Sequence, residues 1–212
     1  PELTPPPGAV VAHVVGSDGT GVLFDAVHDD AACTALLTLI EKQGELPARH
    51  GVIRGYAGAR FDKARGPRAR ILPPTRGAVE QSNTSVRFGG RLILKVFRRQ
   101  QPGPNPDVEV IGYLSDHTRF THVPPFAGAI DYAASEGEPS TLAMLQGLVS
   151  NQGDGWTWAL EELDRYYEAT APAATPGDVA SKLVATPLVD LAQEPDHELA
   201  REYLGPALDS AA

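Results

Sequence analysis

Two adjacent glycines between two β-prone runs constrain the fold of this chain more than any other feature of the sequence. The runs are residues 85–88 and 91–97, and Gly89-Gly90 stands between them. Glycine adopts the positive φ angles of the two-residue turns whose twist matches that of paired strands. The sequence therefore predicts an antiparallel hairpin, and with it a β-sheet that other segments must complete.

Helical and extended patterns follow this hairpin in a simple order. Asn105-Pro106-Asp107 supplies a helix N-cap, a proline at the first helical position and an acid in the first turn. Residues 122–132 and 141–149 then have the composition of two strands. The order strand, strand, helix, strand, strand is that of a kinase-like amino-terminal lobe.

The part of the chain before the hairpin has its own pattern. Residues 9–15 and 22–27 predict a hairpin across a glycine-rich turn, and Asp29-Asp30 predicts the start of a helix that ends near Gly44. Residues 57–75 are rich in arginine, glycine and proline. We therefore expect an exposed connector and a domain boundary there.

Beyond residue 154 the pattern becomes helical. Trp156, Leu160, Leu163 and Tyr167 recur on one helix face, and residues 178–208 contain weaker helical segments. We expect an α+β fold, with a small first unit over residues 1–75, a β-β-α-β-β unit over residues 76–150 and a helical part over residues 151–212.

Positive charge is concentrated in one segment of an acidic chain. The net charge is −9, yet residues 49–99 hold 13 of the 18 lysines and arginines against two acids, Asp62 and Glu80, which gives +11 there and −20 elsewhere. Such asymmetry favours either an anionic partner, such as nucleotide phosphates or a nucleic acid, or a solvated basic face balanced by the acidic remainder.

Cysteine content and apolar runs bear on the compartment. The single cysteine, Cys33, cannot form an internal disulfide, and its alanine and leucine neighbours predict a buried apolar role. The longest apolar runs are too short to span a bilayer, and no secretory signal pattern is present. We expect a cytoplasmic protein that does not contact a membrane. Because the chain begins at Pro1 without a methionine, we also expect it to be part of a longer polypeptide.

The hairpin and the helix after it carry residue types that suit a nucleotide site. Such a site needs donors for phosphate oxygens, a lysine on the neighbouring strand and a carboxylate from the next helix. Serine and threonine in residues 81–85 supply donors, Lys95 supplies a cation and Glu109 a carboxylate. A lysine in so apolar a strand either extends its ammonium to solvent at a sheet edge or binds an anion, and these residues leave both open.

Several blocks of sequence resemble the maltokinase family, which are bacterial kinases that make maltose 1-phosphate from maltose and ATP and are often fused to trehalose synthase. The blocks are VEQSNTSV (79–86), LILKVFRR (92–99), NPDVE (105–109), TLAMLQ (141–146) and NQGDGW (151–156). The resemblance covers about residues 22–167. It implies a cap subdomain over residues 1–75, a protein-kinase-like ATP-binding lobe over residues 76–150 and the helical start of an incomplete carboxyl-terminal lobe over residues 151–212. It also implies that the parent enzyme acts in trehalose and glycogen metabolism.

The resemblance also implies roles for particular residues. Lys95 would bind the α and β phosphates of ATP and pair with Glu109. The residues over the phosphates would be Ser82, Asn83, Thr84 and Ser85, and those that meet adenine through backbone groups would be Gln146, Gly147 and Leu148. The catalytic aspartate, the Mg²⁺ ligands and the sugar pocket would lie in the missing lobe, so no catalytic residue and no metal ligand is assigned here.

Two functions follow as expectations. In the first, the chain is the ATP-binding portion of a maltokinase-type sugar kinase and is inactive alone. Its expected partners are a nucleotide, a maltose acceptor and a trehalose synthase, and no nucleic acid is expected to bind. In the second, the chain is a non-catalytic binding module whose basic residues 49–99 bind a polyanion or a protein. One departure bears on the first function, because Gly147 stands where an acidic residue is common in the family.

Overall fold

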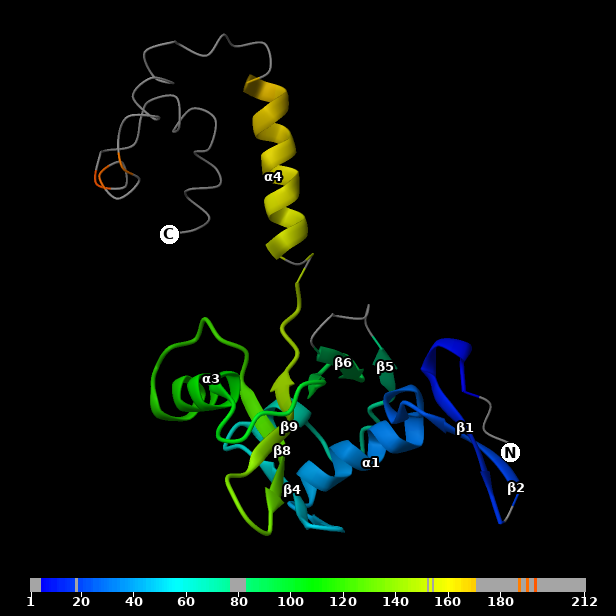
Figure 1. Cartoon of the computed structure of the whole chain (residues 1–212). Helices are drawn as coiled ribbons and strands as arrows, with labels where there is room; N and C mark the ends of the chain where they lie inside the picture. Colours follow the sequence, from blue (N-terminus) through cyan, green and yellow to red (C-terminus); the bar gives the residue numbers. More distant parts are fainter. Residues whose placement is uncertain are drawn as a thin grey trace. The chain divides into compact units, whose positions relative to one another are not determined.

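A seven-stranded antiparallel sheet forms the centre of the first unit of this computed structural model (Figure 1). The structure describes residues 5–17, 19–76, 83–151, 153, 155–170, 187, 190 and 193. Two compact units divide the chain, Pro1–Val149 and Ser150–Ala212. Antiparallel strands accompanied by a few helices confirm the predicted α+β class.

The strands pair as neighbours in a fixed order. Across the sheet the order is β3 (Glu45–Ala48), β4 (Gly51–Ala57), β8 (Phe126–Ala134), β9 (Ser140–Gly147), β7 (Leu92–Phe97), β6 (Asn83–Phe88) and β5 (Pro74–Arg76). A separate hairpin consists of β1 (Val10–Gly16) and β2 (Gly19–Phe24). Both predicted hairpins and the two predicted later strands are confirmed, whereas β3, β4 and β5 were not predicted.

The glycine pair makes the turn that the sequence predicted. Gly89 and Gly90 have φ angles of 54° and 68°, and they join β6 to β7. The resulting register places Phe88 opposite Leu92 and Ser85 opposite Lys95. A side chain with a β-carbon is strained at these angles, so the two glycines fix the register of the hairpin.

The helices begin at the caps that the sequence indicated. They are α1 (Asp30–Glu41), α2 (Phe61–Arg65), α3 (Pro106–His117) and α4 (Gly155–Thr170), with short 3₁₀ turns η1 (Pro7–Ala9) and η2 (Ala26–His28). The Asp29 side chain accepts a hydrogen bond from the Ala31 N–H at 2.9 Å, and Asn105 accepts one from the Asp107 N–H at 3.0 Å. Both predicted starts are therefore confirmed. The helical segments expected over 178–208 fall outside the described residues, apart from three single positions.

One face of the sheet packs against α1 and α2, and we call it the α1 face. Its core consists of fifteen buried residues: Val27, Cys33, Leu37, Leu39, Ile40, Phe61, Leu72, Val86, Phe88, Leu92, Leu94, Ala127, Ile130, Ala143 and Leu145. A β-carbon on Gly55 would lie 2.5 Å from the Leu39 carbonyl oxygen. Glycine at this position in β4 therefore allows α1 to approach the sheet closely.

The opposite face packs against α3, and we call it the α3 face. Strand residues alternate between the two faces, so Ala129 and Met144 lie on this side while Ile130 and Leu145 lie on the other. Its core holds four buried residues, with Val108 and Ile111 of α3 packed against them. The smaller core leaves part of the α3 face without apolar cover.

The segment between β4 and β5 is packed, which corrects the expectation of an exposed connector. Phe61 is 3% exposed and Leu72 is 7% exposed, and both join the α1-face core. Arg65 is also buried and donates to two nearby backbone carbonyl oxygens at 2.8 and 2.9 Å. An arginine that satisfies carbonyl groups lets a segment rich in arginine and proline lie against a core. Because β4 pairs with β8, strands from both sides of this segment share one sheet.

Cys33 has the buried role that the sequence predicted. It is fully buried, and its thiol donates to the Val27 carbonyl oxygen at 3.2 Å. Burial raises the pKa of the thiol. Cys33 is therefore a core residue, not an activated nucleophile.

In the second unit, α4 has the predicted helical conformation. Its expected apolar stripe is exposed among the described residues, with Trp156 at 74% and Tyr167 at 64%. No described helix of the chain is long and apolar enough to cross a membrane.

Candidate functional site

A row of side chains crosses the α3 face from one strand to the next. Lys95 in β7 lies opposite Ser85 in β6 and opposite Met144 in β9. Met144 in turn lies opposite Ala129 in β8. Directly opposed residues on one face have Cβ atoms about 4.5–5.5 Å apart, so the Ser85 hydroxyl and the base of the Lys95 side chain are neighbours.

Three buried polar atoms on this face have no hydrogen-bond partner among the described residues. They are the Oγ of Ser85, a residue 7% exposed, the Nε2 of Gln146, a residue 2% exposed, and the Oδ1 of Asp131, which lies two positions after Ala129 in β8. Gln146 shares its face with Met144 because the two are separated by two positions in β9. A buried group without a partner costs about 1–3 kcal/mol, and native proteins rarely leave one. These atoms therefore mark a place where a polar ligand would be stabilised.

Lys95 is partly buried beside Ser85. Its ammonium forms no ion pair with any carboxylate in the described ranges. An apolar strand that holds an unneutralised cation beside a serine hydroxyl suits an anion that accepts hydrogen bonds from both. β7 is an interior strand, between β6 and β9, so the alternative of a lysine at a sheet edge does not apply.

Helix α3 is fixed to the sheet at its carboxyl-terminal end. Ser115 Oγ accepts a hydrogen bond from the Phe126 N–H at 3.1 Å, and the Ser115 carbonyl accepts one from Arg60 at 2.8 Å. Glu109 lies nearer the other end and is exposed. Within the described part of the chain, Glu109 forms no ion pair with Lys95. The structure therefore places the expected pair on facing elements without joining them.

The segment expected to meet adenine is tied to the sheet through its backbone. The Gly147 N–H donates to the Pro125 carbonyl at 2.8 Å, and the Leu148 N–H donates to the Arg91 carbonyl at 2.7 Å. Both N–H groups are thus engaged within the chain. A base bound here would rely on carbonyl oxygens as acceptors, or on the side-chain amide of Gln146.

The four residues expected over the phosphates do not share one environment. Ser82 lies outside the described residues. Asn83 is partly buried, and Thr84 faces the α1 side, where its Oγ1 accepts a hydrogen bond from Arg98 at 2.7 Å. Of the four, Ser85 is the residue that the structure places beside Lys95. The unpartnered amide of Gln146 was not predicted from the sequence, since its burial depends on strand pairing.

Most of the basic segment is used inside the fold. Of the thirteen basic residues in 49–99, seven arginines form hydrogen bonds or ion pairs within the chain: Arg54, Arg60, Arg65, Arg68, Arg76, Arg91 and Arg98. Arg76, for example, donates to the Val27 carbonyl and pairs with Asp30, both at 2.6 Å. Guanidinium groups held in this way are not presented as a free basic face. The charge excess is therefore weak support for a polyanion-binding surface.

Metal ligands are not gathered in the described part of the chain. There, no group of three or more His, Cys, Asp or Glu side chains is placed to hold a metal ion.

Comparisons with known proteins give limited information. No model of a known protein family matches the sequence. A solved structure of a glucosamine kinase is similar to this chain, with a TM-score of 0.42 and 21% sequence identity over 77% of the chain. This chain spans 38% of the length of that kinase. A likeness at this level assigns neither an activity nor a substrate to this chain.

Proposed function

We propose that the α3 face of the sheet binds the phosphates of a nucleotide, as the ATP-binding part of a kinase that phosphorylates a sugar hydroxyl. The observation that carries this proposal is the opposition of Ser85 and Lys95 on neighbouring strands, where neither the hydroxyl nor the ammonium has a partner among the described residues. Such a pair offers a hydrogen bond and a positive charge to the same phosphate.

The strand order supports the same proposal. β5, β6 and β7 are sequential neighbours, α3 follows, and β8 and β9 complete the sheet with β9 beside β7. Protein kinases likewise carry their phosphate-binding lysine on the third strand and a partner glutamate on the next helix. On this proposal Lys95 and Glu109 would be the corresponding lysine and glutamate.

The finer assignment rests on the sequence blocks that resemble maltokinases. On that basis the acceptor would be maltose, the product maltose 1-phosphate, and a trehalose synthase a partner of the parent protein. Bound ATP would supply the phosphoryl group, and this chain would position and neutralise its phosphates. The resemblance would place the Mg²⁺ ligands in the carboxyl-terminal lobe of the parent enzyme.

Nucleotide titration of the whole chain tests the proposal. ATP binding followed by isothermal calorimetry should weaken by about 10- to 100-fold in Lys95→Ala, because one charge-assisted phosphate contact is worth about 1.5–3 kcal/mol. Lys63→Ala is the matched control, since Lys63 is an exposed lysine of the same basic segment. Equal ATP affinity in the Lys95 and Lys63 variants would remove the phosphate-binding role of Lys95.

A further inference from the structure

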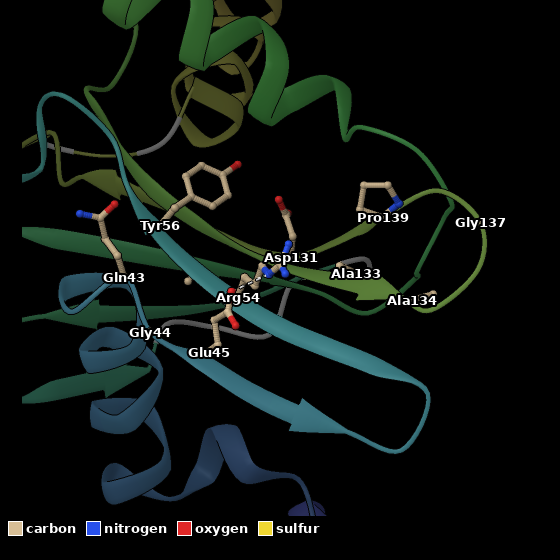
Figure 2. A pocket seen from close by; sticks show the side chains of 11 residues that line it. Gln43, Gly44, Glu45, Arg54, Tyr56, Asp131, Ala133, Ala134, Gly137 and Pro139 are labelled. Carbon is tan, nitrogen blue, oxygen red and sulfur yellow. Dashed lines mark ion pairs between the residues drawn. The ribbon is translucent and has the colours of Figure 1, made fainter.

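A pocket lies at the edge of the sheet formed by β3, β4 and β8 (Figure 2). Its volume is about 420 Å³, within the range of small-molecule sites. Eleven residues line it: Gln43, Gly44, Glu45, Arg54, Gly55, Tyr56, Asp131, Ala133, Ala134, Gly137 and Pro139. None of these residues belongs to the proposed nucleotide site.

One carboxylate oxygen in this pocket is buried without a partner. Asp131 interrupts the otherwise uncharged strand β8, and its Oδ1 forms no hydrogen bond with any described residue. Arg54 lies opposite Asp131 in the neighbouring strand, yet it pairs with Glu45 at 2.8 Å. Glu45 and Arg54 neutralise each other at the exposed rim, so the net negative charge of the pocket comes from Asp131.

The Tyr56 hydroxyl is a donor beside this carboxylate. Figure 2 shows the Tyr56 ring and the Asp131 carboxylate on the same side of the strands. Burial, with the nearby charge of Asp131, raises the pKa of Tyr56 to about 12, so the hydroxyl stays neutral and able to donate. The ring face beside the carboxylate would also favour a cation.

The backbone at the pocket entrance is held in an unusual conformation. Gln43 has a φ of 48°, in the left-handed region that residues with a β-carbon seldom adopt. Its N–H donates to the Ile40 carbonyl at 3.0 Å, which ties this conformation to the end of α1. The result places the Gln43 side-chain amide among the lining groups.

We propose that this pocket binds a small organic ammonium compound, with its cationic group on Asp131 and a neighbouring oxygen on the Tyr56 hydroxyl. An ammonium supplies the charge and the hydrogen bond that Oδ1 lacks, and a hydroxyl or carbonyl oxygen beside it accepts from Tyr56. The pocket shares the α3 face with the proposed nucleotide site but involves different residues, and Asp131 in β8 lies two strand spacings, about 10 Å, from β7.

Ethanolamine is a suitable probe because it carries an ammonium and a hydroxyl two carbons apart. Titration of the ¹⁵N-labelled whole chain, followed by NMR, should give saturable shifts at the amides of Ala133, Ala134 and Gly137. Ethylene glycol, which has a hydroxyl in place of the ammonium, should not saturate the site. Ethylammonium, which lacks the hydroxyl, should bind more weakly than ethanolamine.

Variants of the chain decide whether Asp131 is the group responsible. Asp131→Asn should weaken ethanolamine binding at least tenfold, whereas Asp116→Asn, at an exposed aspartate of α3, should leave it unchanged. Ala133→Phe, on the same face of β8 as Asp131, keeps the carboxylate and fills the pocket, and it should also abolish binding. If Asp131→Asn does not fold, Ala133→Phe alone decides the result.

Three outcomes overturn the proposal: unchanged affinity in the folded Asp131 or Ala133 variants, equal binding of ethylene glycol, or shifts that spread over acidic surface residues without saturation. Loss of ATP binding in Lys95→Ala with ethanolamine binding intact would confirm that the two sites are separate.

Discussion

The α1 face and the α3 face of the sheet are built from alternate residues of the same strands, yet the two faces differ in whether their buried polar groups form hydrogen bonds. On the α1 face, fifteen buried apolar residues form one core, and the arginines at its margin donate to carboxylates or carbonyl oxygens. On the α3 face, four buried apolar residues share the surface with Ser85, Gln146 and Asp131, whose Oγ, Nε2 and Oδ1 atoms have no hydrogen-bond partner among the described residues.

This difference indicates that the α1 face contributes most to the stability of the fold and that the α3 face is better suited to ligand binding. A face on which apolar area is buried and polar groups are satisfied stabilises the fold. A face that leaves polar atoms unsatisfied is less stable than it could be, and such local costs are typical of binding sites. Variants on the two faces should therefore have different effects on the free energy of unfolding and on ligand affinity.

The largest expected effect is the loss of a core aromatic on the α1 face. Phe88 is fully buried in β6, so Phe88→Ala should lower the free energy of unfolding by about 3–5 kcal/mol. Arg87→Ala, at the exposed neighbouring position, should change it by less than about 0.5 kcal/mol. Urea denaturation of both variants measures the difference. Similar midpoints would show that the α1 face does not dominate stability.

The sequence predicted those parts of the fold that have local signals. The glycine pair predicted the β6–β7 hairpin, Asn105 predicted the start of α3, and Asp29 that of α1. Strands β3 and β4 lack such signals, because β3 has four residues and contains Pro47, as an edge strand can. Burial of Phe61 and Leu72 was also not predictable, since two apolar residues eleven positions apart give no periodic pattern.

The candidate site could be predicted only in part, for a related reason. Lys95 and Ser85 were identified from their residue types on a predicted hairpin and from the resemblance to maltokinases. Gln146 and Asp131 depend on the pairing of β9 with β7 and of β4 with β8, which join segments distant in the sequence. An aspartate in an otherwise apolar strand was a visible signal, although its lack of a partner was not.

The pH dependence of stability should have opposite signs at two carboxylates. Burial raises the pKa of Glu41, but hydrogen bonds and charge from Arg68 and Arg65 outweigh this and hold it below its ordinary value. Burial raises the pKa of Asp131, and hydrogen bonding from Thr141 offsets this only in part. Charge on Glu41 therefore stabilises the fold, and charge on Asp131 destabilises it.

Two isosteric variants test whether the charge on each carboxylate raises or lowers the free energy of unfolding. At pH 7, Glu41→Gln should lower the free energy of unfolding by about 1–2 kcal/mol, and Asp131→Asn should raise it. The Glu41 effect should fade as pH falls below its ordinary pKa of 4.5 and through its lowered value in the folded protein. The Asp131 effect should fade as pH falls through its raised value toward 3.8. Denaturation curves from pH 7 to pH 3 test both, and effects of the same sign would contradict the assignment.

The smallest expected effect on stability comes from Ser85 and provides the closest comparison of the two faces. Thr84 and Ser85 are adjacent in β6 and both buried, but Thr84 Oγ1 accepts a hydrogen bond from Arg98 whereas Ser85 Oγ has no partner. Thr84→Val, which keeps the shape and removes the acceptor, should lower the free energy of unfolding by about 1 kcal/mol. Ser85→Ala should leave it within about 0.5 kcal/mol of the parent, or raise it, because no hydrogen bond is lost.

For ATP affinity, the Ser85 variant should show the larger effect and the Thr84 variant the smaller one, the reverse of their effects on stability. If Ser85 contacts phosphate, Ser85→Ala should weaken ATP binding about three- to tenfold, while Thr84→Val should leave it nearly unchanged. Calorimetry with ATP and urea denaturation on the same two proteins give the four values. A Ser85→Ala variant that loses stability but keeps its ATP affinity would place Ser85 among the structural residues, and the α3 face would then bind nucleotide without it.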